Sequence, residues 1–237
     1  MKSLVPLLAL CATLLCPPCG AAEPLRIASW NRSSEPATQA AEAVLNRAYA
    51  ELVQPIEFVE LPVRRALRAL LAGEVDANLY RIAALAQEQP QLHRVETPVL
   101  TLAAYSYANK DGPRPAKWGD LAGLRVAHLR GVLLIEQQVP ADARRVEAGT
   151  VDELFRLLAL QMVDVVVTVE ARLALPLGQR VSPAIARADA ELAALPMHHY
   201  LGERHGELAR RLDAVLARLK ASGELDRLLQ RHLQPTR

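Results

Sequence analysis

A single arginine, Arg81, follows a short apolar run from Val75 to Leu79. If that run is a strand, Arg81 lies at its carboxyl end, where ligands of open α/β sheets collect. The guanidinium group is a planar fork that can hold a carboxylate through two charge-assisted hydrogen bonds. We therefore expect Arg81 to bind an anionic group. The alternative is that it caps the strand or pairs with a nearby acidic side chain.

Two aromatic residues are expected close to Arg81. Trp30 ends the first strand, at the same edge of the sheet if the strands are parallel, and could lay its ring against a ligand. The alternative is a ring packed at the lobe edge. Tyr80 is a weaker candidate, because alternation along the strand would turn Tyr80 towards the core and Arg81 away from it.

Three charged residues complete the candidate binding set. Arg65 lies near the start of an expected helix, where it is more suited to bracing acidic side chains than to touching a ligand. Arg130 and Glu170 stand near the ends of two expected strands in the second half of the chain. We predict that these two residues approach the ligand from the opposite side.

The histidines do not predict a metal site. His198 and His199 are adjacent on an expected strand and would point to opposite faces, and their spacing to His205 fits no common zinc site. The sequence contains no Gly-x-Ser-x-Gly stretch and no phosphate-cradling glycine loop. We therefore expect no catalytic residues, no metal and no cofactor.

The elements that position these residues alternate between strand and helix, which is the signature of a layered α/β architecture. In the first half, apolar spacing predicts helices capped by Ser34 and opened by Pro62, between strands at 25–30, 56–60 and 75–80. In the second half, a capping box from Thr150 to Glu153 opens a helix between strands at 124–129 and 163–169.

The hydrophobic periodicity is interrupted around 111–115, and the chain looks extended again from 190 to 200 before two closing helices. We place lobe boundaries at these two points. The first lobe would comprise residues 23–108 plus 190–237, and the second lobe residues 109–189. A similar stretch occurs once on each side of the first boundary, LLAGEVD at 70–76 and LLALQMVD at 157–164, and favours two similarly built lobes.

The N-terminus predicts a secretory signal peptide at residues 1–22. Lys2 precedes an apolar run from Leu4 to Leu15, and small residues then lead into Glu23. The run is shorter than the roughly 20 apolar residues that span a bilayer. The three cysteines, Cys11, Cys16 and Cys19, all lie in this segment, so the mature chain would contain neither a disulfide nor a reactive thiol.

The composition excludes some classes of protein. The chain is 51% hydrophobic and 23% charged, which is typical of an ordinary globular protein rather than a disordered one. Its net charge of +2 comes from dispersed residues rather than a basic block, so no nucleic-acid partner is expected.

Several stretches resemble family 3 of the bacterial periplasmic solute-binding proteins. They are LPVRRAL at 61–67, GEVD at 73–76 followed by Arg81, WGDLAGLRVA at 118–127, and Tyr200-Leu201 with the helix after it. In this order they cover nearly the whole mature chain. The resemblance implies a two-lobed, type II periplasmic-binding-protein-like α/β fold with a hinge, and a carboxylate-binding arginine at about the place of Arg81.

The chain departs from the amino-acid-binding members in three places. The Gly-Phe-Asp-type run after the first strand has no counterpart near 35–45, and Arg130-Gly131-Val132 stands where those members have Gly followed by Ser or Thr. Val169 occupies the position of the acid that usually receives the ligand's amino group, with Glu170 one residue on. The chain is thus similar to a divergent member, and its ligand could be another small polar anion.

The resemblance implies a periplasmic transport receptor and not an enzyme. Such a protein captures a small polar, amino-acid-like solute between its lobes and delivers it to the membrane permease of an ABC transporter. Two alternatives remain open: a sensor subunit for a membrane signalling protein, and a dehydratase-like enzyme on the same fold. We expect a soluble monomer.

Overall fold

The first lobe is built on three parallel strands. In the computed structural model, which describes residues 23–30, 35–178 and 182–234, β1 (Leu25–Ser29) pairs with both β2 (Ile56–Glu60) and β3 (Ala77–Ile82). Helix α1 (Pro36–Glu51) connects β1 to β2, and α2 (Val63–Leu71) connects β2 to β3. These elements confirm the strands and helices expected from periodicity. The expected signal peptide and the Ser34 cap lie outside the described residues.

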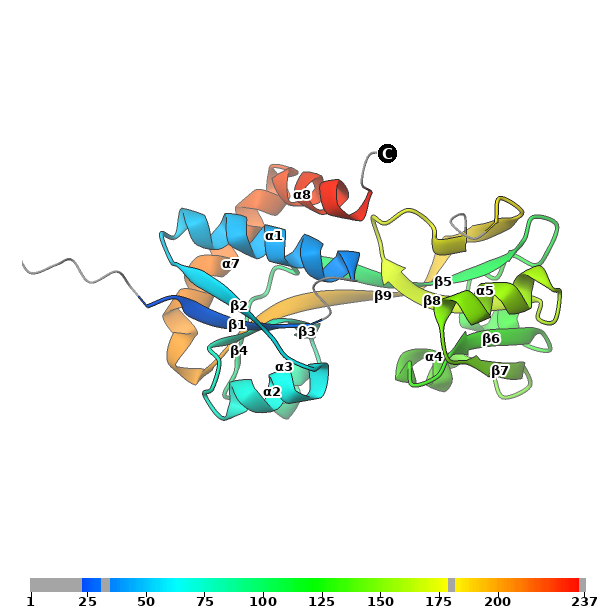
Figure 1. Cartoon of the computed structure of the whole chain (residues 1–237), viewed down its shortest axis with the longest axis horizontal. Helices are drawn as coiled ribbons and strands as arrows, with labels where there is room; N and C mark the ends of the chain where they lie inside the picture. Colours follow the sequence, from blue (N-terminus) through cyan, green and yellow to red (C-terminus); the bar gives the residue numbers. More distant parts are fainter. Residues whose placement is uncertain (1–22, 31–34, 179–181, 235–237) are drawn as a thin grey trace, which may run out of the picture.

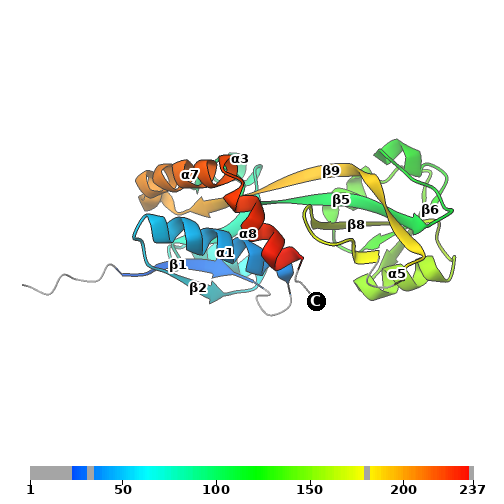
Figure 2. The same cartoon turned by 90° about the horizontal axis from the view of Figure 1, so that it is seen from above.

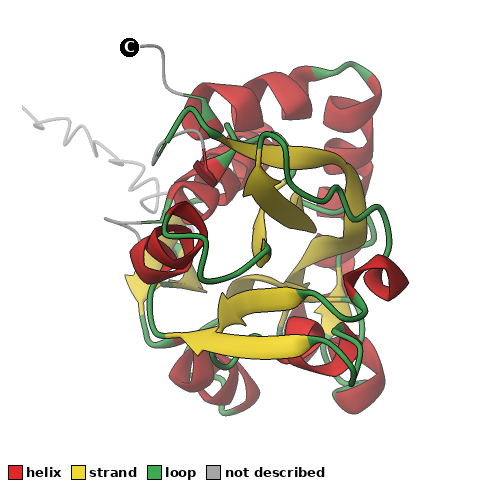
Figure 3. Cartoon of the chain, turned by 90° about the vertical axis from the view of Figure 1, so that its right-hand side faces the viewer, coloured by secondary structure: helices red, strands yellow, loops and turns green. Residues whose placement is uncertain are grey.

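The second lobe repeats this plan. β6 (Arg125–Leu129) pairs in parallel with β7 (Arg144–Ala148) and β8 (Val165–Ala171), and α4 (Leu133–Gln138) and α5 (Val151–Ala159) follow β6 and β7. The hydroxyl of Thr150 accepts the backbone N–H of Glu153 at 3.2 Å, which confirms the predicted start of α5. Seen end on in Figure 3, the helices lie around the strands.

Two long antiparallel strands join the lobes (Figures 1 and 2). β5 (Leu100–Asn109) and β9 (Ile185–Leu201) run from one lobe into the other, and β4 (His93–Arg94) pairs with β9. The main path of the sheet is β2-β1-β3-β9-β5-β8-β6-β7. The remaining elements are α3 (Leu85–Glu88), η1 (Trp118–Leu121), η2 (Glu203–His205), α7 (Gly206–Ala221) and α8 (Glu224–Leu233). No helix of the described residues is long and apolar enough to cross a membrane.

The strand directions bring the carboxyl ends of both parallel sets face to face. β5 runs from the first lobe into the second, and β8 is antiparallel to it, so β8, β6 and β7 end towards the first lobe. β9 runs the opposite way, and β3 is antiparallel to it, so β3, β1 and β2 end towards the second lobe. The loops that follow the strands of each lobe therefore face the other lobe.

The buried apolar residues divide into cores on either side of this region. Leu100 belongs to the core of the first lobe, whereas Ala103 and Tyr105 of the same strand belong to a core of the second lobe. On β9, Met197 packs in the first core and Leu192 in the second lobe. The cores thus separate inside β5 and β9, because a continuous strand can serve two cores without a break in its periodicity.

The repeated Val-Asp stretch has the same structural task in each lobe. The Asp76 carboxylate accepts the backbone N–H of Arg26 at 2.8 Å, and the Asp164 carboxylate accepts the backbone N–H of Arg125, also at 2.8 Å. In both cases an aspartate that precedes one parallel strand holds a backbone N–H at the start of its neighbour. The match across the expected boundary therefore reflects two similarly built lobes.

Candidate functional site

A β-bulge in β3 places Asn78 and Arg81 on the same side of the strand. Asn78 pairs with Tyr200 and Arg81 with His198, so β3 advances three residues while β9 advances two. Without the bulge, residues three apart would point to opposite faces. The bulge lies at the end of β3 that faces the second lobe.

The Arg81 side chain is held by three neutral groups. Its Nε–H donates to Oδ1 of Asn78 at 2.9 Å, and Nη2 donates to the carbonyl oxygen of Val63 at 2.7 Å, at the start of α2. Its guanidinium carbon lies 4.9 Å from the ring centroid of Trp30, within range of a cation–π interaction. Nη1 has no hydrogen-bond partner among the described residues.

The charge of Arg81 is not neutralised. Burial lowers the pKa of its guanidinium, and no carboxylate of the described residues forms an ion pair with it. By contrast, Arg125, Arg172 and Arg187 each contact a carboxylate, at 2.7, 2.6 and 2.6 Å. Arg81 is thus a half-buried cation whose contacts with the described residues are to neutral groups.

Glu35, just before α1, is the opposite case. Burial raises the pKa of its carboxyl, and no arginine or lysine of the described residues pairs with it. The charges of Glu35 and Arg81 both reach Tyr80, whose hydroxyl pKa is raised mainly by burial, further raised by Glu35 and lowered by Arg81. Glu35, which is exposed, and Arg81, which is half-buried, therefore both lie near Tyr80 at the same end of the first lobe. The sequence analysis missed Glu35.

Trp30 and Tyr80 form an aromatic pair beside Arg81. Their rings meet edge to face, 4.9 Å apart at 73°, and the side chains are 7% and 6% exposed. Thr38 on α1 is fully buried nearby, and its side chain lowers the pKa of the Tyr80 hydroxyl. Tyr80 points inwards as alternation predicts. Trp30 is brought to Arg81 as expected, but its ring is mostly packed at the lobe edge.

Glu170 does not face the first lobe. Its side chain is 3% exposed, and its carboxylate accepts Tyr107 Oη at 2.7 Å, Arg187 Nη1 at 2.6 Å and the backbone N–H of Leu177 at 3.2 Å. The pleat of β8 turns this residue towards the core under α5, beside Tyr107 on β5. These hydrogen bonds hold the Glu170 carboxylate within the second lobe, and its role as a ligand contact stays a prediction.

Arg130 and Arg65 are not gathered around Arg81 by any contact. Arg130 follows β6, at an end that faces the first lobe, and pairs with Glu147 at 3.0 Å in an exposed position. Arg65 is exposed on α2, where it lines a shallow groove with Arg68 and Glu74. A ligand role for Arg130 stays a prediction. Arg65 lies on the outer side of α2, and its ligand role also stays a prediction.

A second polar network lies where β5, β8 and β9 enter the second lobe. Glu191 accepts two hydrogen bonds from Arg172, at 2.7 and 2.6 Å, and one from Tyr105 Oη at 2.8 Å. Burial, and then the Glu191 carboxylate, raise the pKa of Tyr105 to about 12. Arg187 lies over the Tyr105 ring at 4.1 Å and links this network to Glu170. The charged side chains of this network are therefore paired with one another.

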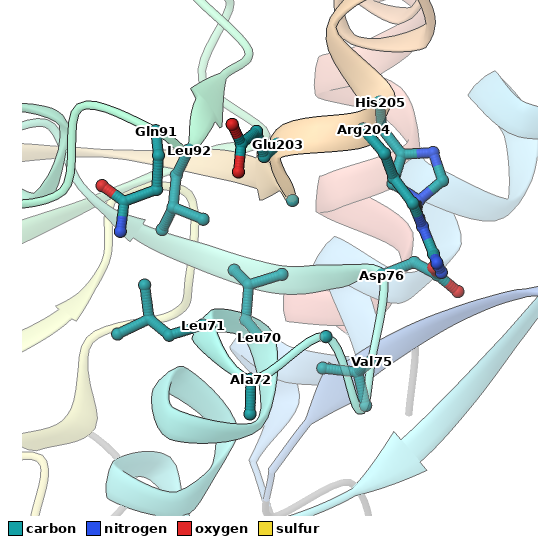
Figure 4. A pocket seen from close by; sticks show the side chains of 12 residues that line it. Leu70, Leu71, Ala72, Val75, Asp76, Gln91, Leu92, Glu203, Arg204 and His205 are labelled. Carbon is teal, nitrogen blue, oxygen red and sulfur yellow. Dashed lines mark hydrogen bonds and ion pairs between the residues drawn. The ribbon is translucent and has the colours of Figure 1, made fainter.

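A cavity of about 360 Å³ lies at the opposite end of β3 (Figure 4). Leu70 and Val75 form part of its apolar side, while Arg204 and His205 both reach the Asp76 carboxylate. Because Asp76 precedes β3 and Arg81 stands near its end, the cavity is about 16 Å along the strand from Arg81. Its charged groups are paired, which is typical of a structural cluster.

The expected separation of the histidines is observed. His198 contacts the carbonyl oxygen of Val95 at 2.9 Å, and His199 lies between Tyr49 Oη at 2.9 Å and the carbonyl oxygen of Leu79 at 3.1 Å. No group of three or more metal-ligating side chains occurs among the residues that the structure describes.

Comparison with known proteins agrees with the observed architecture. No family model matches the sequence, and an uncharacterized protein of Shewanella oneidensis is 25% identical over 201 residues, 80% of this chain and 74% of that protein. The structure resembles the unliganded open L-cystine solute receptor of Neisseria gonorrhoeae, with a TM-score of 0.71, 16% identity and coverage of 88% of this chain and 92% of that one.

Two further structures connect the fold to ligand sensing. The GluR0 ligand-binding core in complex with L-glutamate has a TM-score of 0.69 and 18% identity, over 90% of this chain and all of that one. A histidine kinase sensor domain similar to periplasmic binding proteins has a TM-score of 0.60 and 19% identity, over 89% and 96%. Identities this low establish the fold alone. The chain has the two-lobed α/β fold of the periplasmic solute-binding proteins, as the sequence predicted.

Proposed function

We propose that this protein binds a small amino-acid-like solute between its two lobes and delivers it to an ABC transporter. The observation that carries the proposal is the half-buried guanidinium of Arg81, which has neutral oxygen atoms and an aromatic ring as partners and no carboxylate of the described residues. Removing a cation from water is costly unless an anion compensates for it. A solute carboxylate at the free Nη1 edge would supply that anion.

Glu35 supports a solute that also carries a positive group. Its carboxyl lies at the exposed start of α1, and its charge and that of Arg81 both reach Tyr80. An ammonium group near Glu35 and a carboxylate near Arg81 would satisfy both residues with one zwitterion. In this arrangement the first lobe holds both charged groups, and Glu170 of the second lobe is not needed.

The second lobe would complete the site by closing over the solute. The loops after β6 and β7 face the first lobe, and Arg130 belongs to the loop after β6. In the proposed closed form these loops cover the solute and exclude water, which strengthens its charged contacts. Secretion by the expected signal peptide would place the protein in the periplasm, beside the permease.

A sensor role is the second candidate. One similar structure is a histidine kinase sensor domain, so the same fold also serves signalling. The two roles share solute binding and differ in the membrane protein that recognises the closed form. Deleting the gene and measuring solute uptake would separate them, because a transport receptor is required for uptake and a sensor is not.

The binding proposal is tested by mass spectrometry of small molecules released when the purified protein is denatured. Calorimetric titration then compares an amino acid with its counterparts, for example L-alanine with propionate and ethylamine. We expect the zwitterionic member of the matching set to bind most tightly, and Glu35→Gln to reduce its advantage over the carboxylate. No released solute and no binding by any standard amino acid or small carboxylate would contradict the proposal.

A further inference from the structure

We infer that Asn78 is the positioning residue that aims Arg81 at the solute and leaves the arginine's positive charge available. The inference rests on the proposed function, because it concerns how the same guanidinium meets its anion. Asn78 lies on β3 and is fully buried, so it acts through Arg81 rather than by touching the solute.

The chemistry at this position requires a carboxamide. The Nδ2 of Asn78 donates to the carbonyl oxygen of Ala66 on α2 at 2.9 Å, and its Oδ1 accepts Nε–H of Arg81 at 2.9 Å. A guanidinium can only donate and a peptide carbonyl can only accept. The residue between them must therefore accept from one and donate to the other, which an amide does and an isosteric carboxylate does not.

The β-bulge brings this clamp together. Asn78 and Arg81 are three residues apart, and the extra residue of β3 turns both side chains to the side of α2. A contact with β9 stabilises the bulge, because the carbonyl oxygen of Leu79 lies 3.1 Å from Nδ1 of buried His199. The Asn78 amide and the Val63 carbonyl oxygen together fix two donors of Arg81, and Nη1 has no hydrogen-bond partner among the residues that the structure describes.

A neutral amide also determines the charge of the site. An aspartate at residue 78 would place a carboxylate against Nε of Arg81 and form a half-buried ion pair. The guanidinium would keep its position, but its charge would be compensated within the protein. Asn78 thus favours an anionic solute. Its neutral amide does not compensate the charge of Arg81, whereas an aspartate at the same position would.

The test follows the Nε–H signal of Arg81 by NMR in the whole protein, with the signal identified by its loss in Arg81→Lys. The probe is acetate, the smallest carboxylate with an apolar group, added at pH 7. In the wild-type protein we expect a protected Nε–H signal that shifts saturably with acetate. In Asn78→Ala the signal should exchange rapidly, and the acetate dissociation constant should rise by about fivefold or more.

The Asn78→Asp variant separates the positioning of the Arg81 guanidinium from the compensation of its charge. It should keep a protected Nε–H signal but lose about tenfold or more in acetate affinity, because its carboxylate replaces the external anion. The matched control is Asn109→Asp, since Asn109 is also a strand residue whose Nδ2 contacts a helix carbonyl, that of Leu158 at 3.3 Å, with no arginine involved. The control should keep wild-type affinity within about twofold.

The outcomes distinguish this inference from the function on which it rests. Equal protection and equal acetate affinity in wild type and Asn78→Ala would overturn the positioning role while leaving solute binding intact. A protected signal lost in Asn78→Ala, with no acetate response even in wild type, would support the positioning role and contradict anion binding at Arg81. If Asn78→Ala does not fold, unchanged acetate affinity in the isosteric Asn78→Asp overturns the inference.

Discussion

At the scale of single residues, binding depends on what faces the Arg81 guanidinium. Replacing Arg81 by alanine removes one partner of a desolvated charge pair, which typically costs about 2–5 kcal/mol, so solute affinity should fall about 30-fold or more. Lysine should restore only part of it, since an ammonium group cannot reproduce the contacts of Nε with Asn78 and of Nη2 with Val63. Calorimetric titration with the identified solute measures both effects.

Thermal unfolding of the same variants separates binding from folding. The partners of Arg81 are neutral, so its loss leaves no buried charge unpaired, and Arg81→Ala should melt within a few degrees of wild type. Arg210→Ala is the control, because Arg210 is exposed on α7 and pairs with exposed Glu207. Wild-type affinity in a well-folded Arg81→Ala would refute the binding role.

The buried pair of Glu170 and Arg187 should behave in the opposite way. Their contact is 2.6 Å with side chains 3% and 21% exposed, so Glu170→Gln leaves a poorly solvated guanidinium without its anion. The free energy of unfolding should fall by about 3 kcal/mol. Glu147→Gln, which breaks the exposed pair with Arg130, should cost less than about 1 kcal/mol. Urea unfolding of both variants measures the difference, and equal losses would show that Glu170 is not a structural residue.

At the scale of elements, the bulge in β3 depends on a histidine of β9. His199 is fully buried, with Nδ1–H donating to the Leu79 carbonyl oxygen and Nε2 accepting Tyr49 Oη at 2.9 Å. This arrangement needs the neutral ring, and burial lowers the pKa of His199 to about 4 from its ordinary value of 6.5. The helix α1, which carries Tyr49, thus supports the strand that carries Arg81.

The His199 pKa predicts how stability changes with pH. Between pH 6.5 and about 4 the unfolded chain binds a proton at His199 and the folded chain does not, so stability is full above pH 6.5 and falls as the pH is lowered. The loss from this residue should approach about 3 kcal/mol. Urea unfolding at several pH values should show a smaller decline in His199→Gln than in wild type. An identical decline in His199→Gln would refute this origin.

At the scale of the whole molecule, the lobes meet through few elements. β5 and β9 connect them, and Ala171 at the end of β8 packs on the core of the first lobe. The cores separate between Leu100 and Ala103 on β5. Bending in this region would move each lobe as a rigid body without disturbing either core. That one moving lobe comprises residues 23–108 plus 190–237 and the other residues 109–189 stays a prediction.

Lobe closure can be measured by small-angle X-ray scattering. A solute that contacts both lobes favours the form that makes all the contacts, so binding should shift the population towards a more compact molecule. We expect the radius of gyration to decrease at saturating solute, and to stay constant in Arg81→Ala at the same concentration. An unchanged radius in the saturated wild-type protein would contradict a hinge mechanism.

The sequence alone determined the fold class, because strand and helix alternate with clear hydrophobic periods and each lobe repeats one plan. It also determined the place of Arg81, since a cation after an apolar strand is a local signal.

The site around Arg81 was decided by tertiary structure. Asn78 was overlooked inside an apolar run, although a polar side chain there was a signal, and the contacts of buried Glu170 with Tyr107 and Arg187 were not predicted. Both depend on register and facing: the contact between Asn78 and Arg81 requires a bulge against β9, whose pairing residues Tyr200 and His198 are more than a hundred positions away. Such pairing is formed by the folded sheet, and no local spacing encodes it.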